Sequence, residues 1–453
     1  MIESEQSISI GAAKPKVLLA PMNMAAMPVT IVRALRDVGF EAAHIQYTTG
    51  GDNPLKYELD RTVDYAKDGG RIGAQFKTLQ EALAEEFDIY HFWNRSLTFR
   101  LDYGGFSGID LPLIKARGKH IAHRFTGYDL RLPSRDLAAN PHSPFRYEQR
   151  PLYDEKLVAA YQDFLVEYVD AFMVQDPEMA QFHPEAEIIP RALDLTKWGY
   201  IGVERKDRPL LVHAPTNPAA KGTRFVLAAI EALRDEGLAF DFKLLRGLPH
   251  AEAQRVYAEA DIIIDQILIG ATGVLTLEAW ALGKPVVVNL RPDLFEPFYD
   301  TTDLPVINAN PDTIKDQLRQ AIKDVDLRLD LAPRGRALVE EKHDIAKVIG
   351  QYVDFYERLF RQPPSTPTGF GDIAYIKMQV ELTEQNERFW PRWRARYRRV
   401  MDRTRDLYAF CANGRPTGKL ALSIAVGRAV VRLFAHAYVS FLRMILRRLK
   451  ILR

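Results

Sequence analysis

The chain has 453 residues, of which 47% are hydrophobic and 26% are charged, and this is the composition of an ordinary globular protein. It excludes a disordered or fibrous chain, and the length predicts two or three domains. The single cysteine, Cys411, excludes an internal disulfide framework and a cysteine-based zinc site and favours a reducing compartment. Residues 1–16 lack the basic and then apolar build of a secretory signal, so we expect a cytoplasmic protein.

The net charge of +2 averages two unlike parts of the chain. Residues 391–453 contain 16 Lys and Arg but 2 Asp and Glu, a net charge of +14. The remainder contains 45 basic and 57 acidic residues, a net charge of −12. Such asymmetry is typical of a segment that binds an anionic partner. A membrane surface, a nucleic acid and the acidic body of the protein itself are the candidates.

In chain order, the first part alternates short apolar segments with helical patterns, the first of them at 28–38. Alternation of this kind predicts a parallel sheet that helices cover on both faces. The predicted strands of this sheet are 16–21, 41–47, 88–93, 119–123, 170–174 and 187–189.

The same pattern then starts again near residue 200. Gly237 and Gly283 follow two of the helical patterns, where glycine suits a helix C-terminus. The predicted fold is therefore α/β, with two Rossmann-like domains that face a cleft, because open α/β sheets bind ligands at the carboxyl ends of their strands. The predicted strands of the second domain are 209–213, 241–245, 261–269, 285–289 and 304–307, and its helices are 223–236, 250–260 and 273–282.

A glycine-bearing loop between a predicted strand and a predicted helix is the most informative segment. It reads Gly270-Ala271-Thr272-Gly273, and the helix that follows carries Glu278. Backbone N–H groups at a helix N-terminus attract phosphate oxygens, and glycine lets a ligand come close. A glutamate nearby can accept hydrogen bonds from ribose hydroxyls. The segment therefore predicts a nucleotide site.

This segment resembles the signature of the retaining glycosyltransferases of family 4, which have the two-domain fold called GT-B. That signature runs Glu-Gly-Phe-Gly, four residues, Glu-Ala-Met-Ala, two residues, then Pro-Val-Val. Here Glu278-Ala-Trp-Ala is followed two residues later by Pro285-Val-Val. The resemblance implies that Glu278 holds the donor ribose. The first glutamate of the signature falls at Gly270 and is absent.

Upstream, Lys221-Gly222 matches the Lys-Gly of the same family, which implies that Lys221 contacts the donor diphosphate and stabilises the leaving group. The family has an arginine about six residues earlier, where this chain has Pro215, so Arg246 is the candidate for the missing charge. The alternative is that Lys221 and Glu278 are ordinary surface residues. With Lys221 as a catalytic group, the predicted donor site comprises Thr216, Asn217, Gly222, Arg246, Gly270, Ala271, Thr272, Gly273 and Glu278.

The loop that starts at His123 resembles the His-Gly-x-Asp loop that the family places at the cleft. The resemblance implies that His123 and Asp129 address the acceptor. The alternative is a loop histidine whose hydrogen bonds are satisfied within the protein and a helix-capping aspartate. His91 and Asn94 end another predicted strand, and we expect them on the acceptor side.

The resemblance also implies transfer without a metal, with the nucleotide-sugar as donor substrate and no further cofactor. Asp324 and Asp326 form the one Asp-x-Asp, which we interpret as a surface turn, and the histidines lack metal-ligand spacing.

The basic tail from Lys419 to Arg453 has an amphipathic pattern. At 100° per residue, the basic side chains of Arg428, Arg432, Arg443 and Arg447 fall on one stripe. Uncharged runs there reach about ten residues, too short for the roughly 20 that span a bilayer. We expect a helix that lies on an anionic membrane surface. A self-docking or homo-oligomer helix is the alternative, and nucleic-acid binding is disfavoured because the body shows no nucleic-acid module.

Together these patterns predict a hexosyltransferase-like glycosyltransferase that moves a sugar from a nucleotide-sugar to a saccharide or lipid-linked acceptor, with retention implied by the resemblance. We expect it to act in surface glycan synthesis at the inner face of the membrane. A nucleotide-sugar epimerase and a non-catalytic GT-B scaffold are the alternatives. The predicted divisions are an acceptor domain (1–195), a donor domain (196–345), a closing helix (346–365), and a linker with the helical tail (366–453).

Overall fold

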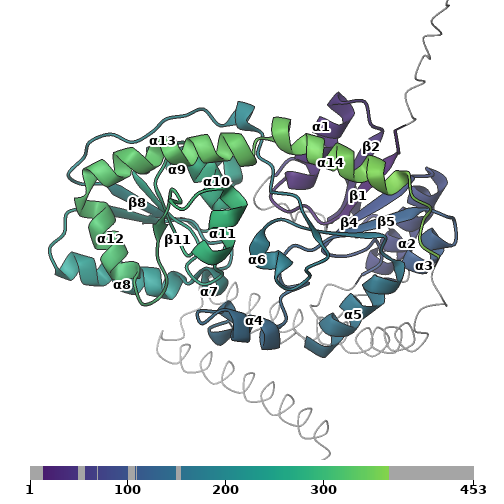
Figure 1. Ribbon diagram of the computed structural model, residues 1–453, viewed down its shortest axis with the longest axis horizontal. Coiled ribbons are helices and arrows are strands. Elements are labelled where there is room, and N and C mark those ends of the chain that lie inside the picture. Colours follow the sequence, from purple (N-terminus) through teal and green to yellow (C-terminus); the bar gives the residue numbers. More distant parts are fainter. Residues whose placement is uncertain are drawn as a thin grey trace, which may run out of the picture. The chain divides into compact units, whose positions relative to one another are not determined.

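The computed structural model describes residues 14–48, 57–68, 70–99, 108, 110–148 and 155–366. Within those residues the chain forms two sheets of parallel strands, and both sheets belong to one compact unit (Figure 1). The predicted α/β class with two Rossmann-like sheets is confirmed. The predicted tail from residue 367 onward lies outside the described residues.

The first sheet has seven strands in the order β3-β2-β1-β4-β5-β6-β7. Its central strands are apolar and buried along their whole length, because helices cover both faces of a parallel sheet. In register, Val17 pairs with Ala42 on one side and with Ile89 on the other. The strands are β1 (Val17–Pro21), β2 (Ala42–Thr48), β3 (Arg61–Asp64), β4 (Ile89–Trp93), β5 (His120–Arg124), β6 (Ala171–Val174) and β7 (Glu187–Ile188).

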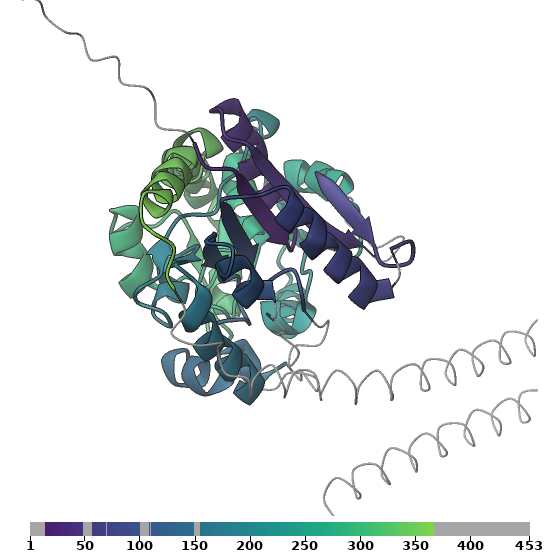
Figure 2. The ribbon, with the colours of Figure 1, turned by 90° about the vertical axis from the view of Figure 1, so that its right-hand side faces the viewer.

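Helices form a layer on each face of the first sheet. One face packs against α1 (Met27–Asp37) and α14 (Ile345–Phe360). The other packs against α2 (Gly70–Ala84), α3 (Asp110–Lys115) and α5 (Glu155–Tyr168), and Figure 2 shows α2 and α14 on opposite sides of the strands. The short elements of this part are α4 (Pro133–Ala139), η1 (Pro144–Arg146), α6 (Pro177–Ala180) and η2 (Leu195–Lys197).

The second sheet has five strands in the order β12-β11-β10-β8-β9. Helices α8 and α12 cover one face, α9, α10 and α11 cover the other, and α13 contributes to both cores. The strands are β8 (Leu210–His213), β9 (Asp241–Leu244), β10 (Ile262–Ile264), β11 (Val286–Val288) and β12 (Ile307–Asn308). The helices are α7 (Pro218–Lys221), α8 (Thr223–Asp235), α9 (His250–Glu259), α10 (Val274–Ala281), α11 (Pro292–Tyr299), α12 (Ile314–Lys323) and α13 (Val325–Lys342).

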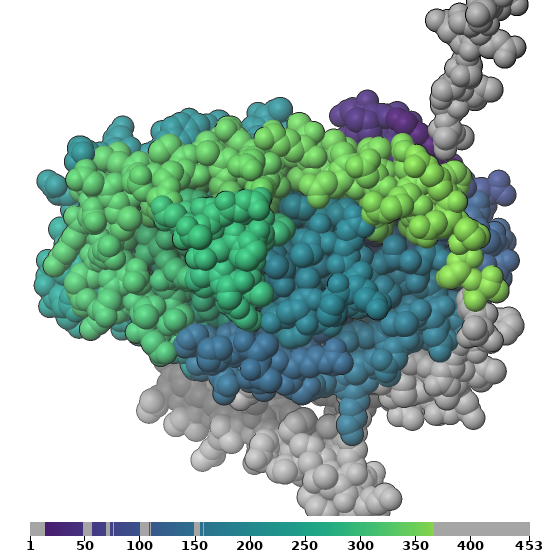
Figure 3. All heavy atoms as spheres, in the orientation of Figure 1, coloured from purple at the N-terminus to yellow at the C-terminus, as the bar shows by residue number. Residues whose placement is uncertain are grey.

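The helix α14 follows the second sheet in sequence but packs on the first. Its apolar stripe, which includes Val348, Tyr352 and Phe355, lies in the same core as Val17 and Leu19 of β1. Figure 3 shows α13 and α14 as a continuous green band that reaches the first-sheet part. The chain therefore returns to its first domain before the described residues end.

Some elements differ from the predicted ones. The segment 61–64 forms β3 at the edge of the first sheet, although its polar sequence gave no strand signal. The predicted strand 261–269 is correct only for residues 262–264, because the chain leaves the sheet at Asp265 and continues as a buried loop. The division of the chain at residues 195 and 345 stays a prediction.

No helix among the described residues is long and apolar enough to span a membrane.

Candidate functional site

Lys221 and Asp265 form an ion pair at the carboxyl edge of the second sheet. Lys221 ends the one-turn helix α7 after β8, and Asp265 directly follows β10. The Lys221 Nζ lies 2.7 Å from Asp265 Oδ1. The lysine side chain keeps 17% of its surface exposed and the aspartate 1%, so only the lysine can reach a ligand.

The carboxylate of Asp265 also fills the N-terminus of α10. Its Oδ2 accepts hydrogen bonds from Gly273 N at 3.0 Å and from Thr276 Oγ1 at 2.7 Å. Burial alone would raise the pKa of Asp265, but the charge and hydrogen bond of Lys221 outweigh it and hold that pKa below its ordinary value. Asp265 is therefore a charged carboxylate at neutral pH.

The loop from Gly270 to Gly273 packs tightly in this site. Gly270 has φ of +79°, a left-handed conformation that favours glycine. Ala271 and Thr272 are buried, and the Ala271 carbonyl accepts a bond from Gln266 Nε2 at 2.5 Å. A Cβ on Gly273 would lie 2.3 Å from the Asp265 carboxylate, so glycine is needed for that approach. The predicted loop is present, and a side-chain carboxylate holds one of its N–H groups.

Glu278 lies on α10 behind this loop and is buried. Its Oε1 lies 2.6 Å from His250 Nε2, at the start of α9, so that this ring nitrogen donates to the carboxylate. Burial raises the pKa of Glu278, and Asp265 adds to the rise, while His250 and Lys221 oppose it. Lys221, Asp265 and Glu278 are thus close enough for their charges to interact, and the structure brings the two predicted donor residues together.

Two aromatic rings cover His250. The ring of Tyr57, from the first-sheet part, lies 5.0 Å from the His250 ring, and that of Trp198 lies 6.0 Å away. Burial raises the pKa of Tyr57 to about 12, and the negative charge of Glu278 adds to the rise. Residues from both parts of the chain therefore surround Glu278.

The other predicted donor residues lie around the end of β8. Asn217 caps α7 and donates from Nδ2 to Glu148 Oε1 of the first-sheet part at 2.6 Å. Thr216 is exposed beside it. Gly222 has φ of +78°, and a Cβ there would lie 2.5 Å from Ile267, so it lets α7 turn into α8. Arg246 is exposed and follows β9.

The structure places His91 in the core instead of at the cleft. Its side chain is fully buried, and its Nδ1 lies 2.6 Å from the Tyr356 hydroxyl of α14. The predicted acceptor-side role needs access that this position lacks, because α14 returns over β4. Asn94 is half-buried, with φ of +67°, and donates to Thr126 Oγ1 at 2.8 Å.

His123 and Asp129 also turn inward. His123 is fully buried, with its ring 4.7 Å from that of Phe125, and neither ring nitrogen has a hydrogen-bond partner. Asp129 accepts bonds from Thr126 N at 3.0 Å and Gly127 N at 2.7 Å, which closes the loop after β5. Burial raises the pKa of Asp129 to about 6. In this structure Asp129 holds a loop of the first-sheet part and His123 lies in its core, so neither exposes a polar atom to a substrate.

Sequence reasoning missed the partners of the site residues. The sequence gives no signal that Asp265 pairs with Lys221, because 44 residues separate them. His250 and Tyr57 carry no signal either, because the bond of His250 to Glu278 and the ring contact of Tyr57 with His250 are long-range. Asn140, whose Nδ2 donates to Leu268 O at 2.7 Å across the two parts, lies 128 residues from its partner.

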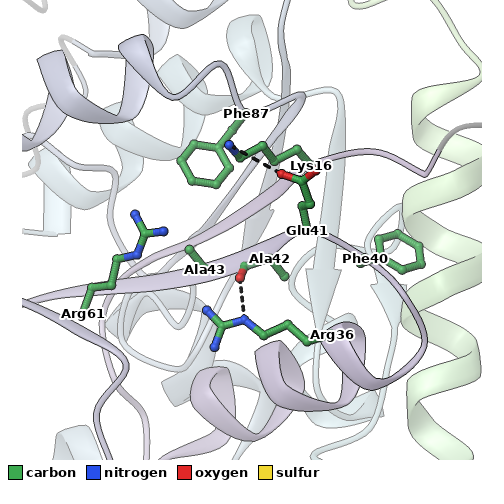
Figure 4. A pocket seen from close by; sticks show the side chains of 8 residues that line it. All are labelled: Lys16, Arg36, Phe40, Glu41, Ala42, Ala43, Arg61 and Phe87. Atoms are coloured by element: carbon green, nitrogen blue, oxygen red, sulfur yellow. Dashed lines mark hydrogen bonds and ion pairs between the residues drawn. The ribbon is translucent and has the colours of Figure 1, made fainter.

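A hollow of about 360 Å³ lies elsewhere, at the amino ends of β1 and β2 (Figure 4). Lys16 lies 3.7 Å from Glu41, Arg36 donates to Ala42 O at 2.8 Å, and Arg61 pairs with Glu85. Parallel α/β sheets bind ligands at the opposite, carboxyl edge. Because its cations already have partners, we assign no ligand to this hollow.

Among the described residues, no group of three or more His, Cys, Asp or Glu side chains is arranged to hold a metal ion. Asp324 caps α13 and Asp326, in the first turn of that helix, pairs with Arg205. The predicted surface position of Asp326 is therefore correct, but the segment begins a helix instead of forming a turn.

Comparison with known proteins identifies the second part of the chain. Residues 209–354 match the family model described as glycosyl transferase-like. No curated protein matches the chain.

Three solved structures share the fold of the described residues. Sucrose-phosphate synthase of Thermosynechococcus elongatus is 14% identical, with a TM-score of 0.56 over 77% of this chain and 100% of that one. The catalytic domain of starch synthase IV from Arabidopsis thaliana, bound to ADP and acarbose, is 12% identical, with a TM-score of 0.53 over 77% and 100%. HepE of Anabaena, in complex with UDP and glucose, is 11% identical, with a TM-score of 0.51 over 76% and 100%.

The resemblance predicted from the sequence is thereby confirmed: the chain has the GT-B fold, and its residues 209–354 match the glycosyl transferase-like family model.

Proposed function

We propose that the protein transfers a sugar from a nucleotide-sugar to an acceptor hydroxyl. One observation carries the proposal: Lys221 and Glu278, which match the family motifs, lie together at the carboxyl edge of the second sheet, inside the matched region. In two proteins of the same fold, the bound molecules are UDP with glucose and ADP with acarbose. A nucleoside diphosphate is therefore the leaving group we propose.

In the proposed reaction, the bond between the sugar carbon and the diphosphate oxygen breaks. A bond forms from that carbon to the acceptor oxygen, and the acceptor releases a proton. The Lys221 ammonium stabilises the negative charge that develops on the departing diphosphate. Glu278, held by His250, accepts hydrogen bonds from the ribose. His91 and His123 belong to the core, so we give them no contact with substrate. Retention of configuration is part of the proposal and rests on the family resemblance.

The direct test is a panel of nucleotide-sugars with release of nucleoside diphosphate as the measured signal. Lys221→Ala should lower turnover by about 10²-fold or more, because the leaving-group charge is lost. Lys206→Ala is the matched control, since Lys206 lies 3.0 Å from the buried Asp261 at the other end of β10. Turnover that is equal in both variants would remove Lys221 from the site, and no binding of any donor would refute the function.

We further propose a lipid-linked or saccharide acceptor at an anionic membrane surface. The support is the sequence alone, namely the net charge of +14 over residues 391–453 and the basic stripe on the tail. Deleting residues 421–453 should abolish flotation with vesicles that contain phosphatidylserine and leave nucleoside diphosphate release unchanged. Equal flotation of both proteins, or binding to neutral vesicles alone, would contradict this part of the proposal.

A further inference from the structure

The carboxylate of Asp265 is a negative charge at the carboxyl edge of the second sheet, where we propose that the diphosphate binds. The carboxylate holds three donors at once, from Lys221, Gly273 and Thr276, at 2.7 to 3.0 Å. A helix N-terminus attracts anions, and here a side chain already occupies the position. The inference drawn from this arrangement rests on the proposed function.

The arrangement is built into the backbone. Asp265 directly follows β10, whose three isoleucines are fully buried, and its backbone N–H donates to Val287 O of β11 at 2.9 Å, so the sheet fixes the position of the aspartate. A Cβ on Gly273 would lie 2.3 Å from Asp265 Oδ2 and 2.9 Å from Lys221 Nζ. The glycine of the predicted phosphate loop therefore makes room for the carboxylate and the ammonium together.

The ion pair with Asp265 also fixes where the Lys221 ammonium lies. An ammonium has three donors, and the bond to Asp265 uses one of them. The lysine side chain is partly exposed while the aspartate is not, so the remaining donors are the ones a phosphate can reach. A diphosphate at Lys221 would then lie within reach of a fixed negative charge.

We propose that Asp265 is a positioning residue with two effects: it orients Lys221 toward the departing diphosphate, and its charge weakens the hold on the released nucleoside diphosphate. Orientation favours the chemical step, and repulsion between like charges favours product release. Removing the charge should therefore tighten product binding and slow turnover, a combination that loss of structure alone does not produce.

The test compares wild type with Asp265→Asn in two measurements. The first is the acetylation rate of Lys221 by acetic anhydride, followed by mass spectrometry with Lys243, which pairs with Glu259 at the surface, as internal reference. The variant should react several-fold faster. The second is calorimetric binding of UDP and ADP, which we expect to be about tenfold tighter in the variant. Uridine and adenosine, which lack phosphates, should bind both proteins equally. Asp261→Asn, the matched control at the other end of β10, should change neither measurement.

Each outcome decides something. If Asp265→Asn binds UDP and ADP with the same affinities as wild type, the proposed repulsion between Asp265 and the diphosphate is wrong. The proposed function is unaffected by that result. Failure of both proteins to bind any nucleoside diphosphate overturns both. An unchanged Lys221 acetylation rate overturns the orienting role.

If Asp265→Asn does not fold, Thr276→Val serves instead, because it keeps the charge and removes one hydrogen bond to Asp265. The carboxylate then has one donor fewer and attracts the Lys221 ammonium more strongly, so Lys221 acetylation should slow while UDP affinity stays unchanged. Acetylation at the wild-type rate in Thr276→Val would overturn the proposal.

Discussion

The pKa values of two buried carboxylates in the candidate site shift in opposite directions, downward for Asp265 and upward for Glu278, because their partners differ. Burial raises the pKa of both groups. Lys221 outweighs this at Asp265, whereas at Glu278 burial dominates over the opposing effect of His250. A buried charge is tolerated only with such a partner, so the loss of either partner has a large expected effect.

Lys221→Ala should lower the free energy of unfolding by about 3 kcal/mol, because it leaves Asp265 charged, buried and without its cation. The double variant Lys221→Ala/Asp265→Asn should recover most of that loss, since the buried charge is then gone. Urea unfolding of the four proteins in the cycle measures both effects. If the single Lys221 variant and the double variant are equally stable, the charge of Asp265 does not depend on Lys221 for its stabilisation.

His213→Gln should make the protein less sensitive to acid. Burial lowers the pKa of His213 to about 4, and the ring lies 2.8 Å from Ile264 O and 2.9 Å from Thr223 Oγ1. Because the folded pKa lies below the unfolded one, the neutral ring stabilises the fold above pH of about 6.5, and this stability is lost as the pH falls toward 4. The wild type should lose about 3 kcal/mol more than the variant between pH 7 and pH 4.

Urea unfolding of wild type and His213→Gln at pH 7, 5.5 and 4 gives this difference. Other buried histidines titrate in both proteins, so the difference between the two curves isolates His213. Parallel curves over the whole range would contradict the prediction.

At the scale of elements, the helices α10 and α13 depend on one close approach. Gly335 of α13 lies against Trp280 of α10, and a Cβ on Gly335 would lie 2.4 Å from Trp280 Cδ1. The indole is fixed, because it is fully buried and its Nε1 donates to Pro305 O at 3.1 Å. The absence of a side chain at Gly335 therefore lets α13 pack closely against α10.

Gly335→Ala should lower the free energy of unfolding by about 1–3 kcal/mol through overpacking against Trp280. Gly350→Ala is the matched control, because Gly350 is also helical and has no atom within 4 Å of the added Cβ. The control should raise stability by about 0.5–1 kcal/mol, since alanine favours a helix over glycine. Thermal unfolding of the two variants checks the pair, and similar effects from both would refute the packing argument.

For the compact unit as a whole, α14 ties the last described helix to the first sheet. The Tyr352 hydroxyl lies 2.6 Å from Arg124 Nη1, and Arg124 also bonds to Ile189 O at 3.0 Å. Arg124 is buried, and desolvation lowers its pKa. The two sheets are also joined directly, by the bonds from Asn140 Nδ2 to Leu268 O and from Asn217 Nδ2 to Glu148 Oε1, so we expect them to unfold together.

Tyr352→Phe should lower the free energy of unfolding by about 1–3 kcal/mol, because a buried cation loses an acceptor. The loss of stability should lower the urea midpoint of both sheets. Trp93 in the first part and Trp280 in the second are buried, so variants with either one as the single tryptophan report each part by fluorescence. We expect the two urea transitions to coincide and to shift together. A transition at Trp280 that does not move when the Trp93 transition does would contradict the coupling.

Local pattern was enough for most elements and for the two motif residues. The apolar run between Lys16 and Pro21 predicts β1, because a parallel strand that is buried on both faces is apolar along its whole length. Lys221 and Glu278 were predicted from their match to the family motifs, whose residues lie close together in the sequence. By contrast, β3 is polar and forms only because β2 offers it an edge, at the register of Arg61 with Ile45.

The sequence by itself determined that this protein is α/β, that its sheet pattern occurs twice, and where the residues that match the family motifs lie, because these features rest on periodicity and on short motifs. Only the tertiary structure decided that Asp265 pairs with Lys221, that His250 and Tyr57 approach Glu278, and that His91 and His123 are core residues. Those outcomes depend on which strand ends meet and on the return of α14. Neither is encoded in the spacing of any one segment.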